Sequence, residues 1–545
     1  MNQTDYDQKA KALLNTDAYV TVRNDPTKTL QSKVQREWRA MKDKYAIPRH
    51  SYFKIYPSGS NLSRFYGLPK IHKENTPLRP IVSGCGSPTH KLAQHLAQIL
   101  KPLAGNTDSL IKNSGHFAEE IRNEIVRENE ELVSFDVENM YGNINVDQAM
   151  EITGEYLSND PTLKDRTPYS VSDILKLLNL CLKNTYFSYR GTIYKQVKGL
   201  SMGSPVSPIV ADLFMEKWEQ KALDSCPIEF KPRIWKRFKD DTFVIGIKDK
   251  SPELKAHLNQ LDHDINVTSE IEKDGVLPHL DCYVIKELNG HLVTKVYRKP
   301  THTNQYLNSQ SNHPASSKRA VVYALMDRAN KIPSKNEWKT EEAATVKKAL
   351  KMNGYSNRFI HKTLERRNQA PQNNERSIST AQIPYIKGLS ERVCGILKDF
   401  KIRGVMRTQT LKDVLSHPKD AVPMGHKTGV IYKVACSVCP KVYIGETKRR
   451  LDDRIAEHKE ACTNIALHEK SALGEHKYDS NHEPNWANIQ IIDSQEHDQK
   501  RRVLETLHIR ENDTINRNTG EEIDPIWINV LRSEGRNDAT SDDPA

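Results

Sequence analysis

Two short apolar runs of this chain contain aspartates, and they lie about a hundred residues apart. The first, at residues 132–137, contains Asp136, and the second, at 237–245, contains the adjacent pair Asp240 and Asp241. Carboxylates buried side by side repel each other unless a cation lies between them. Three carboxylates that hold two Mg²⁺ ions are a minimal site for in-line nucleotidyl transfer. The pattern therefore predicts the metal site of a polymerase, whereas an exposed turn is the alternative for the aspartate pair taken alone.

The composition of the chain favours a polyanionic partner. Its 545 residues are enough for about three or four domains, and its net charge of +11 suits nucleic acid, with a merely soluble basic surface as the alternative. No apolar run reaches the ~18 residues that span a bilayer, and the N-terminus lacks the features of a secretory signal. Eight cysteines over this length do not form a disulfide framework. We therefore expect an intracellular protein that is not secreted and has no membrane partner.

Segments of different composition predict an α/β (α+β) protein of several domains. In the first half, β-rich runs alternate with amphipathic stretches, and a basic helical segment and a polar linker follow. The predicted segments are an N-terminal helical extension (1–45), an α/β region (46–300), a basic helical segment (301–366), a linker region (367–425), a small α+β unit (426–533) and a disordered tail (534–545).

Further motifs surround the aspartates. Tyr141 follows Asp136 by five residues, and the glycine-spaced segment 196–205 precedes a predicted helix. Glycines let the backbone approach a base or nucleotide without a Cβ in the way. Upstream, Lys70 and Arg79 supply cations that can neutralise a triphosphate.

In this order the motifs resemble the fingers and palm of reverse transcriptases, and their sequences are similar to those of the Penelope-like retroelements. The phrases that carry the resemblance are Pro-Ser-Gly-Ser (57–60), Arg-Phe-Tyr-Gly-Leu-Pro-Lys-Ile-His-Lys (64–73), Val-Tyr-Arg-Lys-Pro-Thr-His-Thr (296–303), Asn-His-Pro (312–314) and Lys-Arg (318–319). The resemblance extends from about residue 11 to residue 531. It implies a right-hand polymerase that uses an RNA template, a DNA primer and deoxynucleoside triphosphates.

The resemblance also implies roles for individual residues. The implied ligands of two Mg²⁺ ions are Asp136, Asp240 and Asp241. The implied nucleotide contacts are Lys70, Arg79, Tyr141, Met202 and Gly203. Tyr141 would exclude the ribose 2′-hydroxyl, and the segment 301–366 would be a thumb that binds the primer–template duplex through its phosphates. An ordinary core aromatic and a solvated loop lysine are the alternatives for Tyr141 and Lys70. Lys239 departs from the family pattern, because many reverse transcriptases have an apolar or small residue there.

Two tyrosine runs near the C-terminus predict a β-hairpin. The first run ends in Tyr432, and the second begins with Tyr443. Arg454 and His458 lie four residues apart on one face of the helix predicted to follow. The unit resembles the GIY-YIG nucleases and the nuclease domain that Penelope-like elements carry after the polymerase. The resemblance implies that the two tyrosines belong to a hydrolytic centre, with His458 as a candidate general base and Arg454 on the scissile phosphate. Core packing is the alternative for the tyrosines.

Two further residues complete the implied nuclease site. Glu505, in a predicted helix, would bind one Mg²⁺ ion, and Asn516, in the loop that follows, would orient the site. Val430 departs from the bare Gly-Ile-Tyr of the first family motif.

A candidate zinc site lies between and after the tyrosine runs. Its residues are Cys436, Cys439, His476 and His482. A Cys-x-x-Cys pair with two spaced histidines fits tetrahedral Zn²⁺, and the resemblance implies a structural ion. Redox chemistry is the alternative for the cysteine pair alone, and exposed loop positions are the alternative for the histidines. His458 and Cys462 remain alternative ligands.

Together these features predict a reverse transcriptase fused to a DNA-nicking endonuclease. The resemblance implies target-primed retrotransposition in the nucleus, with DNA as target and primer. A nucleic-acid-binding protein with a decayed polymerase is one alternative, and a nuclease that retains the palm only as an RNA-binding scaffold is another. The sequence gives no prediction of the oligomeric state.

Overall fold

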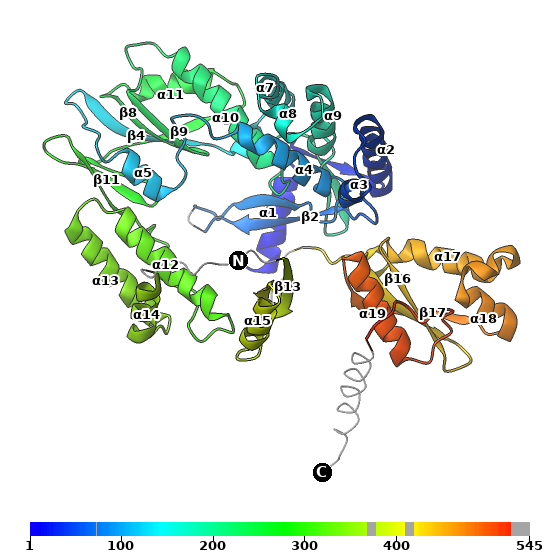
Figure 1. The fold of residues 1–545 in the computed structure, drawn as a ribbon. Coiled ribbons are helices and arrows are strands. Elements are labelled where there is room, and N and C mark those ends of the chain that lie inside the picture. Colours follow the sequence, from blue (N-terminus) through cyan, green and yellow to red (C-terminus); the bar gives the residue numbers. More distant parts are fainter. Residues whose placement is uncertain (72, 368–377, 409–418, 525–545) are drawn as a thin grey trace.

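The chain forms an α/β body, a helical bundle and a C-terminal α/β unit, as Figure 1 shows. The computed structural model describes residues 1–71, 73–367, 378–408 and 419–524. The fold is mixed α/β, as the sequence predicts. The predicted disordered tail at 534–545 lies outside the described residues.

A five-stranded sheet lies in the N-terminal part of the body. Its strands, in order across the sheet, are β1 (Tyr19–Val22), β6 (Thr192–Gln196), β5 (Tyr186–Tyr189), β2 (Ser63–Pro69) and β3 (Leu78–Ser83). The segment predicted as a helical extension contains α1 (Gln3–Leu14) and α2 (Thr27–Tyr45), but it also contributes β1, which the prediction missed. Leu14 of α1 packs with Phe65 and Phe187 of the sheet. α1 and β1 are therefore part of this sheet's fold.

A four-stranded antiparallel sheet holds the aspartates. Its strands, in order, are β7 (Ile234–Phe238), β8 (Asp241–Ile247), β4 (Glu130–Val137) and β9 (Val267–Ile271). The run at 237–245, predicted as one strand, is instead a hairpin. Lys239 has a left-handed backbone (φ +58°), which ends β7 and begins a tight turn into β8.

Helices cover both sheets and enclose one large apolar core. The helices are α3 (Arg49–Ile55), α4 (His90–Leu100), α5 (Ser114–Glu120), α6 (Met140–Asn143), α7 (Val146–Ser158), α8 (Leu163–Arg166), α9 (Val171–Leu182), α10 (Ser207–Asp224) and α11 (Ser251–Gln260). Trp38 of α2, Leu96 of α4 and Phe214 of α10 belong to the same buried cluster as Val133 and Phe135 of β4. This shared core fixes the aspartate-bearing strand relative to α2, α4 and α10.

Three more strands and a helical bundle follow. The strands are β10 (Val276–His279), β11 (Cys282–Lys286) and β12 (Leu292–Val296), and the helices are α12 (Ala315–Lys331), α13 (Asn336–Met352) and α14 (Asn357–Arg367). Val322, Val346 and Ile360, one from each helix, share a small core of their own. The helical prediction for residues 301–366 is confirmed from Ala315 onward, whereas residues 301–314 form no helix.

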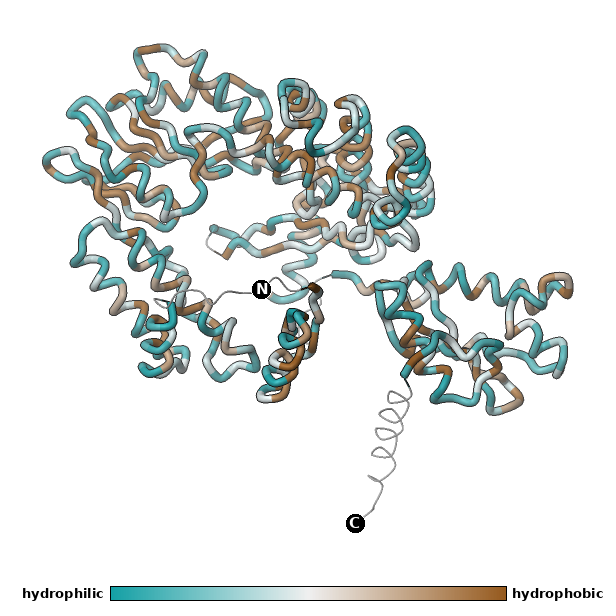
Figure 2. Tube along the Cα trace, in the orientation of Figure 1, coloured by the Kyte–Doolittle hydropathy of each residue, from teal (hydrophilic) through white to brown (hydrophobic). Residues whose placement is uncertain are grey.

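Part of the predicted linker region has regular structure. Residues 378–408 form β13 (Ser379–Pro384), α15 (Ser390–Asp399) and β14 (Ile402–Arg407), with the two strands parallel. Ile396 and Phe400 of this unit are exposed, and Figure 2 shows its apolar stretches in brown. Within the part of the chain that is described, no helix has both the length and the apolar character that a membrane crossing requires.

The C-terminal unit, residues 426–524 of the described chain, is built on the predicted hairpin. Its elements are β15 (Val430–Cys436), β16 (Val442–Thr447), α17 (Leu451–Thr463), α18 (Ala472–Ser480), β17 (Pro484–Ser494) and α19 (Asp498–Glu511). Tyr432 of β15 pairs with Gly445 of β16 and with Ile491 of β17 on its other side. The prediction of a hairpin followed by a helix is confirmed.

Candidate active sites

The three predicted aspartates lie together at one end of the four-stranded sheet. Asp136 on β4 and Asp241 on β8 are antiparallel partners, so their side chains point to the same face. Asp240 precedes Asp241 in the turn, and its carbonyl oxygen accepts a 3.1 Å hydrogen bond from the Val137 amide. Strand register thus brings together residues that are about a hundred positions apart in sequence.

The environment of Asp136 and Asp241 disfavours their negative charge. Burial and then the Asp240 carboxylate raise the pKa of Asp136. Burial, followed by the charges of Asp240 and Asp136, raises the pKa of Asp241 to about 6. A divalent cation would relieve both effects, and half-buried carboxylate oxygens are the donors that Mg²⁺ prefers. The residues therefore fit a Mg²⁺ site.

Cations face the carboxylates from the β2–β3 hairpin. Burial lowers the pKa of Lys70, as do the neighbouring charges of Lys73 and Arg79, while Asp136 and Asp240 act in the opposite direction. The two predicted triphosphate contacts therefore lie in one electrostatic cluster with the aspartates, and Lys73 belongs to it as well.

Lys299 also belongs to the site, because its charge acts to lower the pKa of Asp241. No role was predicted for Lys73 or Lys299. Both residues lie within the segments that carry the family resemblance, at 64–73 and 296–303, and this position could have indicated that they belong to the site.

The glycine-spaced segment joins the two sheets next to the aspartates. The Leu200 amide donates a 2.6 Å hydrogen bond to the Tyr141 carbonyl, and the Val82 amide of β3 donates one of 2.8 Å to the Met202 carbonyl. Gly203 has φ +129°, and a Cβ there would overlap the Val82 carbonyl oxygen, so only glycine fits. The predicted pocket residues Met202 and Gly203 are thus positioned by contact with β3.

Tyr141 lies in the same electrostatic environment as the aspartates. Burial raises its pKa to about 12, and the charges of Asp212 and Asp240 contribute. The half-buried ring packs at the margin of the large core. Both the predicted contact with a nucleotide and the alternative of core packing are compatible with this position.

A buried ion pair lies beneath the aspartate turn. Arg237 on β7 is fully buried, and its Nε donates to Oε2 of Glu219 on α10 at 2.7 Å. Its Nη1 donates to the Lys239 carbonyl at 3.2 Å, which holds the left-handed residue of the turn. Sequence analysis missed this pair, because charged residues in such runs are usually exposed.

Lys239 also acts on Asp212. Burial raises the pKa of Asp212, and the charges of Arg237 and Lys239 oppose this rise. Lys239 therefore contributes to this site through its backbone conformation and through Asp212.

Replacing Arg237 by methionine is expected to cost about 3–5 kcal/mol of stability, since Glu219 is left buried and unpaired. In the double variant Arg237→Met, Glu219→Met most of this stability should return, because no charge remains buried. The double variant should still need a higher Mg²⁺ concentration for any activity of the site, since nothing holds the Lys239 carbonyl. Thermal unfolding and a Mg²⁺ titration measure the two effects, and an unchanged Mg²⁺ dependence would exclude a positioning role for Arg237.

The predicted tyrosines of the C-terminal unit meet His458. The Tyr432 hydroxyl and His458 Nε2 are 2.7 Å apart, and His458 Nδ1 lies 2.6 Å from the Ser471 hydroxyl. The rings of Tyr443 and His458 are 5.0 Å apart. Burial lowers the pKa of His458 to about 3, so the ring is neutral at pH 7. Because each ring nitrogen contacts a hydroxyl, a proton reaches His458 through Tyr432 or Ser471.

Arg454 and Glu505 lie beside the tyrosines. Arg454 Nη1 donates to Glu457 Oε2 at 2.9 Å. Burial raises the pKa of Tyr432 and Tyr443, and the charge of Arg454 opposes this rise. Burial and the Glu446 carboxylate raise the pKa of Glu505 to about 7. A half-buried carboxylate with a raised pKa fits a divalent cation.

Asn516 is placed at the edge of the same unit. Its side chain accepts a 2.9 Å hydrogen bond from the Ile444 amide and donates one of 2.6 Å to the Ile444 carbonyl. It therefore binds the backbone of β16 next to Tyr443.

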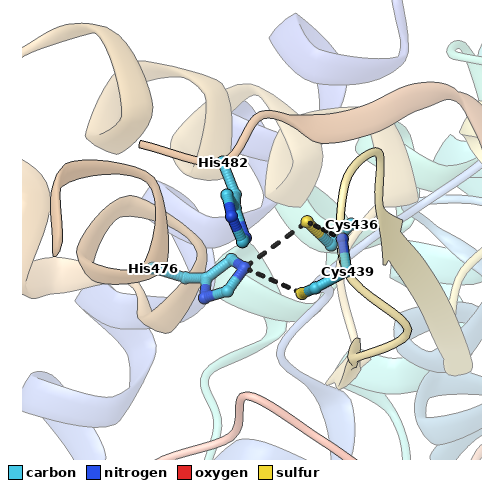
Figure 3. Close-up of side chains that lie close together, drawn as sticks. All are labelled: Cys436, Cys439, His476 and His482. Carbon is cyan, nitrogen blue, oxygen red and sulfur yellow. Dashed lines mark hydrogen bonds between the residues drawn. The ribbon is translucent and has the colours of Figure 1, made fainter. Parts of the chain in front are cut away.

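Cys436, Cys439, His476 and His482 converge, as Figure 3 shows. One ligand atom from each lies within 4.8 Å of all the others. In the described ranges this is the one group of three or more His, Cys, Asp or Glu side chains so compact, and the aspartates described above form no such group. His458 and Cys462, the alternative ligands, do not belong to it.

The donors of this group fit Zn²⁺. The amides of Val438 and Cys439 each donate to Cys436 Sγ at 3.4 Å, and such donors favour a thiolate. The buried Nδ1 of His482 has no hydrogen-bond partner within the described chain, as an unfilled ligand atom would.

Two family models match parts of this chain. Residues 71–269 match the family model described as reverse transcriptase (RNA-dependent DNA polymerase), and residues 305–365 match the model of the animal helix-turn-helix domain. The chain therefore contains a reverse transcriptase domain, within which the three aspartates lie, and a helix-turn-helix domain over α12–α14. Neither match reaches the C-terminal unit, and a search of curated proteins found no match.

Solved structures with some similarity are polymerases. An apo telomerase from Candida tropicalis, truncated from its C-terminal domain, is 13% identical over 43% of this chain and 57% of that chain, with a TM-score of 0.31. Candida albicans telomerase with a fragment of telomeric RNA is 12% identical over 67% of this chain and 61% of that chain, with a TM-score of 0.40. The Sicinivirus RNA-dependent RNA polymerase is 11% identical over 58% of this chain and 70% of that chain, with a TM-score of 0.38. The match thus spans less than two thirds of either telomerase chain.

Proposed function

We propose that the chain is an RNA-directed DNA polymerase whose nucleotidyl-transfer site is formed by Asp136, Asp240 and Asp241. The pairing of β4 with β8 carries this proposal, because it places Asp136 opposite Asp241, with Asp240 in the adjoining turn, inside the reverse transcriptase domain. The proposal assigns the five-stranded sheet to the fingers and the four-stranded sheet to the palm. RNA template, DNA primer and deoxynucleoside triphosphates are the proposed substrates.

Each group around the aspartates has a distinct part in this proposal. Two Mg²⁺ ions, when bound there, would activate the primer 3′-hydroxyl and stabilise the charge of the leaving pyrophosphate. Lys70 and Arg79 neutralise the triphosphate, which approaches from the fingers hairpin. Tyr141 restricts the space at the sugar, and the Met202–Gly203 backbone lies against the base or sugar, where a Cβ would obstruct it.

The helical bundle is proposed to act as the thumb. α12–α14 follow the palm directly, and their match to a helix-turn-helix domain supports contact with a DNA-containing duplex. Binding is expected to depend on phosphate contacts and therefore to weaken steeply with salt.

We further propose that the C-terminal unit is a GIY-YIG-type endonuclease that nicks DNA, in a target-primed scheme like that of Penelope-like elements. The contact of Tyr432 with His458, and the position of Arg454 and Glu505 beside Tyr443, support this proposal. Arg454 holds the scissile phosphate, Tyr432 transfers the proton of the attacking water to His458, and Glu505 is the Mg²⁺ ligand. The nucleus is the proposed place of action.

The Cys436–Cys439–His476–His482 group is proposed to hold a structural Zn²⁺ ion. It links the β15–β16 turn to α18 and the segment after it, in a unit with a small core. Such an ion contributes folding free energy directly.

About one equivalent of zinc per chain is therefore expected by elemental analysis, and replacing Cys436 by serine should remove most of it. Thermal unfolding of the C-terminal unit should then occur at a lower temperature, as it should after chelation of the wild-type protein. Replacing the buried Cys462 by serine is the matched control, and zinc content should not change. An equal zinc content in Cys436→Ser and wild type would exclude this ligand.

The polymerase proposal is tested by extension of oligo(dT) on poly(rA). We expect incorporation of dTTP that requires Mg²⁺ and discriminates against UTP, with less discrimination in Tyr141→Ala. A folded chain that binds the duplex but incorporates no nucleotide would favour a decayed polymerase. If it also nicks DNA, the palm is an RNA-binding scaffold for a nuclease.

A further inference from the structure

The C-terminal unit contacts the fingers through a buried arginine. Arg450, at the N-terminus of α17, is 7% exposed. Its Nε donates to the Ser60 carbonyl at 3.1 Å, and its Nη2 lies 3.3 Å from Oδ2 of Asp25. Although burial raises the pKa of Asp25, hydrogen bonds from Thr27 and the charge of Arg450 lower it. A guanidinium is buried at low cost only with such partners, so this contact is specific.

The loop at 57–60, Pro-Ser-Gly-Ser, forms the other side of this contact. Gly59 has φ +64°, and a Cβ there would overlap the Lys448 carbonyl oxygen and lie 2.9 Å from the Arg449 Cα. The two backbones therefore touch directly. The loop itself is fixed to α2, because Gln31 accepts from the Ser60 amide at 2.9 Å. The function proposed above gives this loop no role.

Two further contacts surround the arginine. At the rim, Lys28 Nζ and Asp453 Oδ1 are 2.7 Å apart. On the connecting chain, Arg64 of β2 donates to the Asp420 carbonyl at 3.1 Å. Figure 1 shows the C-terminal unit beside the part of the body that carries α2 and α3.

We infer that the 57–60 loop is a docking socket for the C-terminal unit, and that docking transfers a nicked DNA end directly to the polymerase. The second half of this inference rests on the proposed polymerase and nuclease functions. Arg450 precedes Arg454 by four residues, which is about 6 Å along a helix. DNA held at Arg454 therefore lies against the fingers. Its new 3′ end meets the polymerase at an effective concentration of about millimolar, as for two linked sites.

Docking is tested without reference to activity by zero-length carbodiimide cross-linking, which joins Lys28 to Asp453 only when the ion pair exists. We expect this cross-link in the wild-type chain and at least about a fivefold loss in Arg450→Ala and in Gly59→Ala, because the charged partner or the backbone fit is removed. The pair Lys477–Glu483, 2.7 Å apart within the C-terminal unit, is the internal control and should not change. Absence of the Lys28–Asp453 cross-link in the wild type would overturn the inference.

Transfer is tested by DNA synthesis primed from a nicked supercoiled plasmid. Gly59→Ala should reduce it at least about fivefold, while separate nicking and separate extension of an annealed primer change less than twofold. Gly191→Ala is the matched control, since Gly191 also has a positive φ (+78°) but has no atom near its Cβ position. Full synthesis without the cross-link would refute the transfer role. A wild type that cross-links but neither nicks nor extends would refute the proposed function and the transfer, and leave the docking contact standing.

Discussion

Primer extension is expected to fall at least about a thousandfold when Asp240 and Asp241 are both replaced by asparagine, a loss of about 4 kcal/mol in transition-state stabilisation. The amides keep the size of the carboxylates but carry no charge, so they bind Mg²⁺ poorly and leave the triphosphate and the 3′-hydroxyl unactivated. The rate of dTTP incorporation on poly(rA)–oligo(dT) at saturating Mg²⁺ measures the effect.

The same double variant is expected to be more stable than the wild type without divalent cations. The pKa of Asp241 is raised to about 6, mainly by burial, so the folded state binds its proton more tightly than the unfolded state does. Stability from this group is present below about pH 4 and is lost as the pH rises through 6. At pH 7.5 the ionised carboxylate therefore destabilises the fold by up to about 3 kcal/mol. A higher Tm of the variant at pH 7.5, with a smaller difference at pH 4, is the expected result.

Mg²⁺ and a neighbouring carboxylate provide the controls. Mg²⁺ should raise the Tm of the wild type but not that of the double variant, because only the wild type binds it. Glu138 is an exposed carboxylate two residues after Asp136, and Glu138→Gln should keep near-normal extension. Extension that survives in the double variant would exclude these aspartates as the metal ligands.

The convergence of the aspartates was predictable because strands follow local rules. A run of apolar residues around Asp136 predicts β4, and a second run predicts the strand that starts at Asp241. The turn between β7 and β8 was not predictable in the same way. Phe238 and Thr242 on either side favour a continuous strand, and lysine at position 239 seldom has a positive φ. Only the completed sheet, with the Arg237 side chain bound to the turn, selects the hairpin.

Features that depend on distant partners were not predictable. β1 is only four residues long, and it exists as a strand because β6, more than 160 residues later, pairs with it. Glu219 and Arg237 are compatible with a core only as a pair. By contrast, the Cys436–Cys439 spacing is local, and the short loop between β15 and β16 keeps the two cysteines close in sequence and in space. The approach of His476 and His482 to the cysteines depends on how α18 and the residues after it pack, which the local sequence does not determine.

Nicking of supercoiled DNA is expected to fall at least about a thousandfold in Arg454→Ala and in Glu505→Gln, since each removes a charge that would stabilise the phosphate transition state. Arg502 of α19 is the matched control, because it is an exposed arginine three residues before Glu505. Its ion pair with Glu521 is long, at 3.5 Å. Arg502→Ala should nick at nearly the normal rate. Neither nuclease variant should alter extension of an annealed primer, since the polymerase site is separate.

The dependence of nicking on pH provides a sharper test of Glu505. Its pKa is about 7, raised by burial and by Glu446, so about nine tenths of these carboxyls are protonated at pH 6 and about one tenth at pH 8. Because the proton competes with Mg²⁺ for the same oxygens, the Mg²⁺ concentration needed for half-maximal nicking should rise about fivefold from pH 7 to pH 6 and change little above pH 8. Titrations of wild-type nicking with Mg²⁺ at pH 6, 7 and 8 measure this, and Glu505→Gln should stay inactive at all three. A Mg²⁺ requirement independent of pH would show that the metal does not bind Glu505, and the hydrolytic site would then have to be placed elsewhere in the unit.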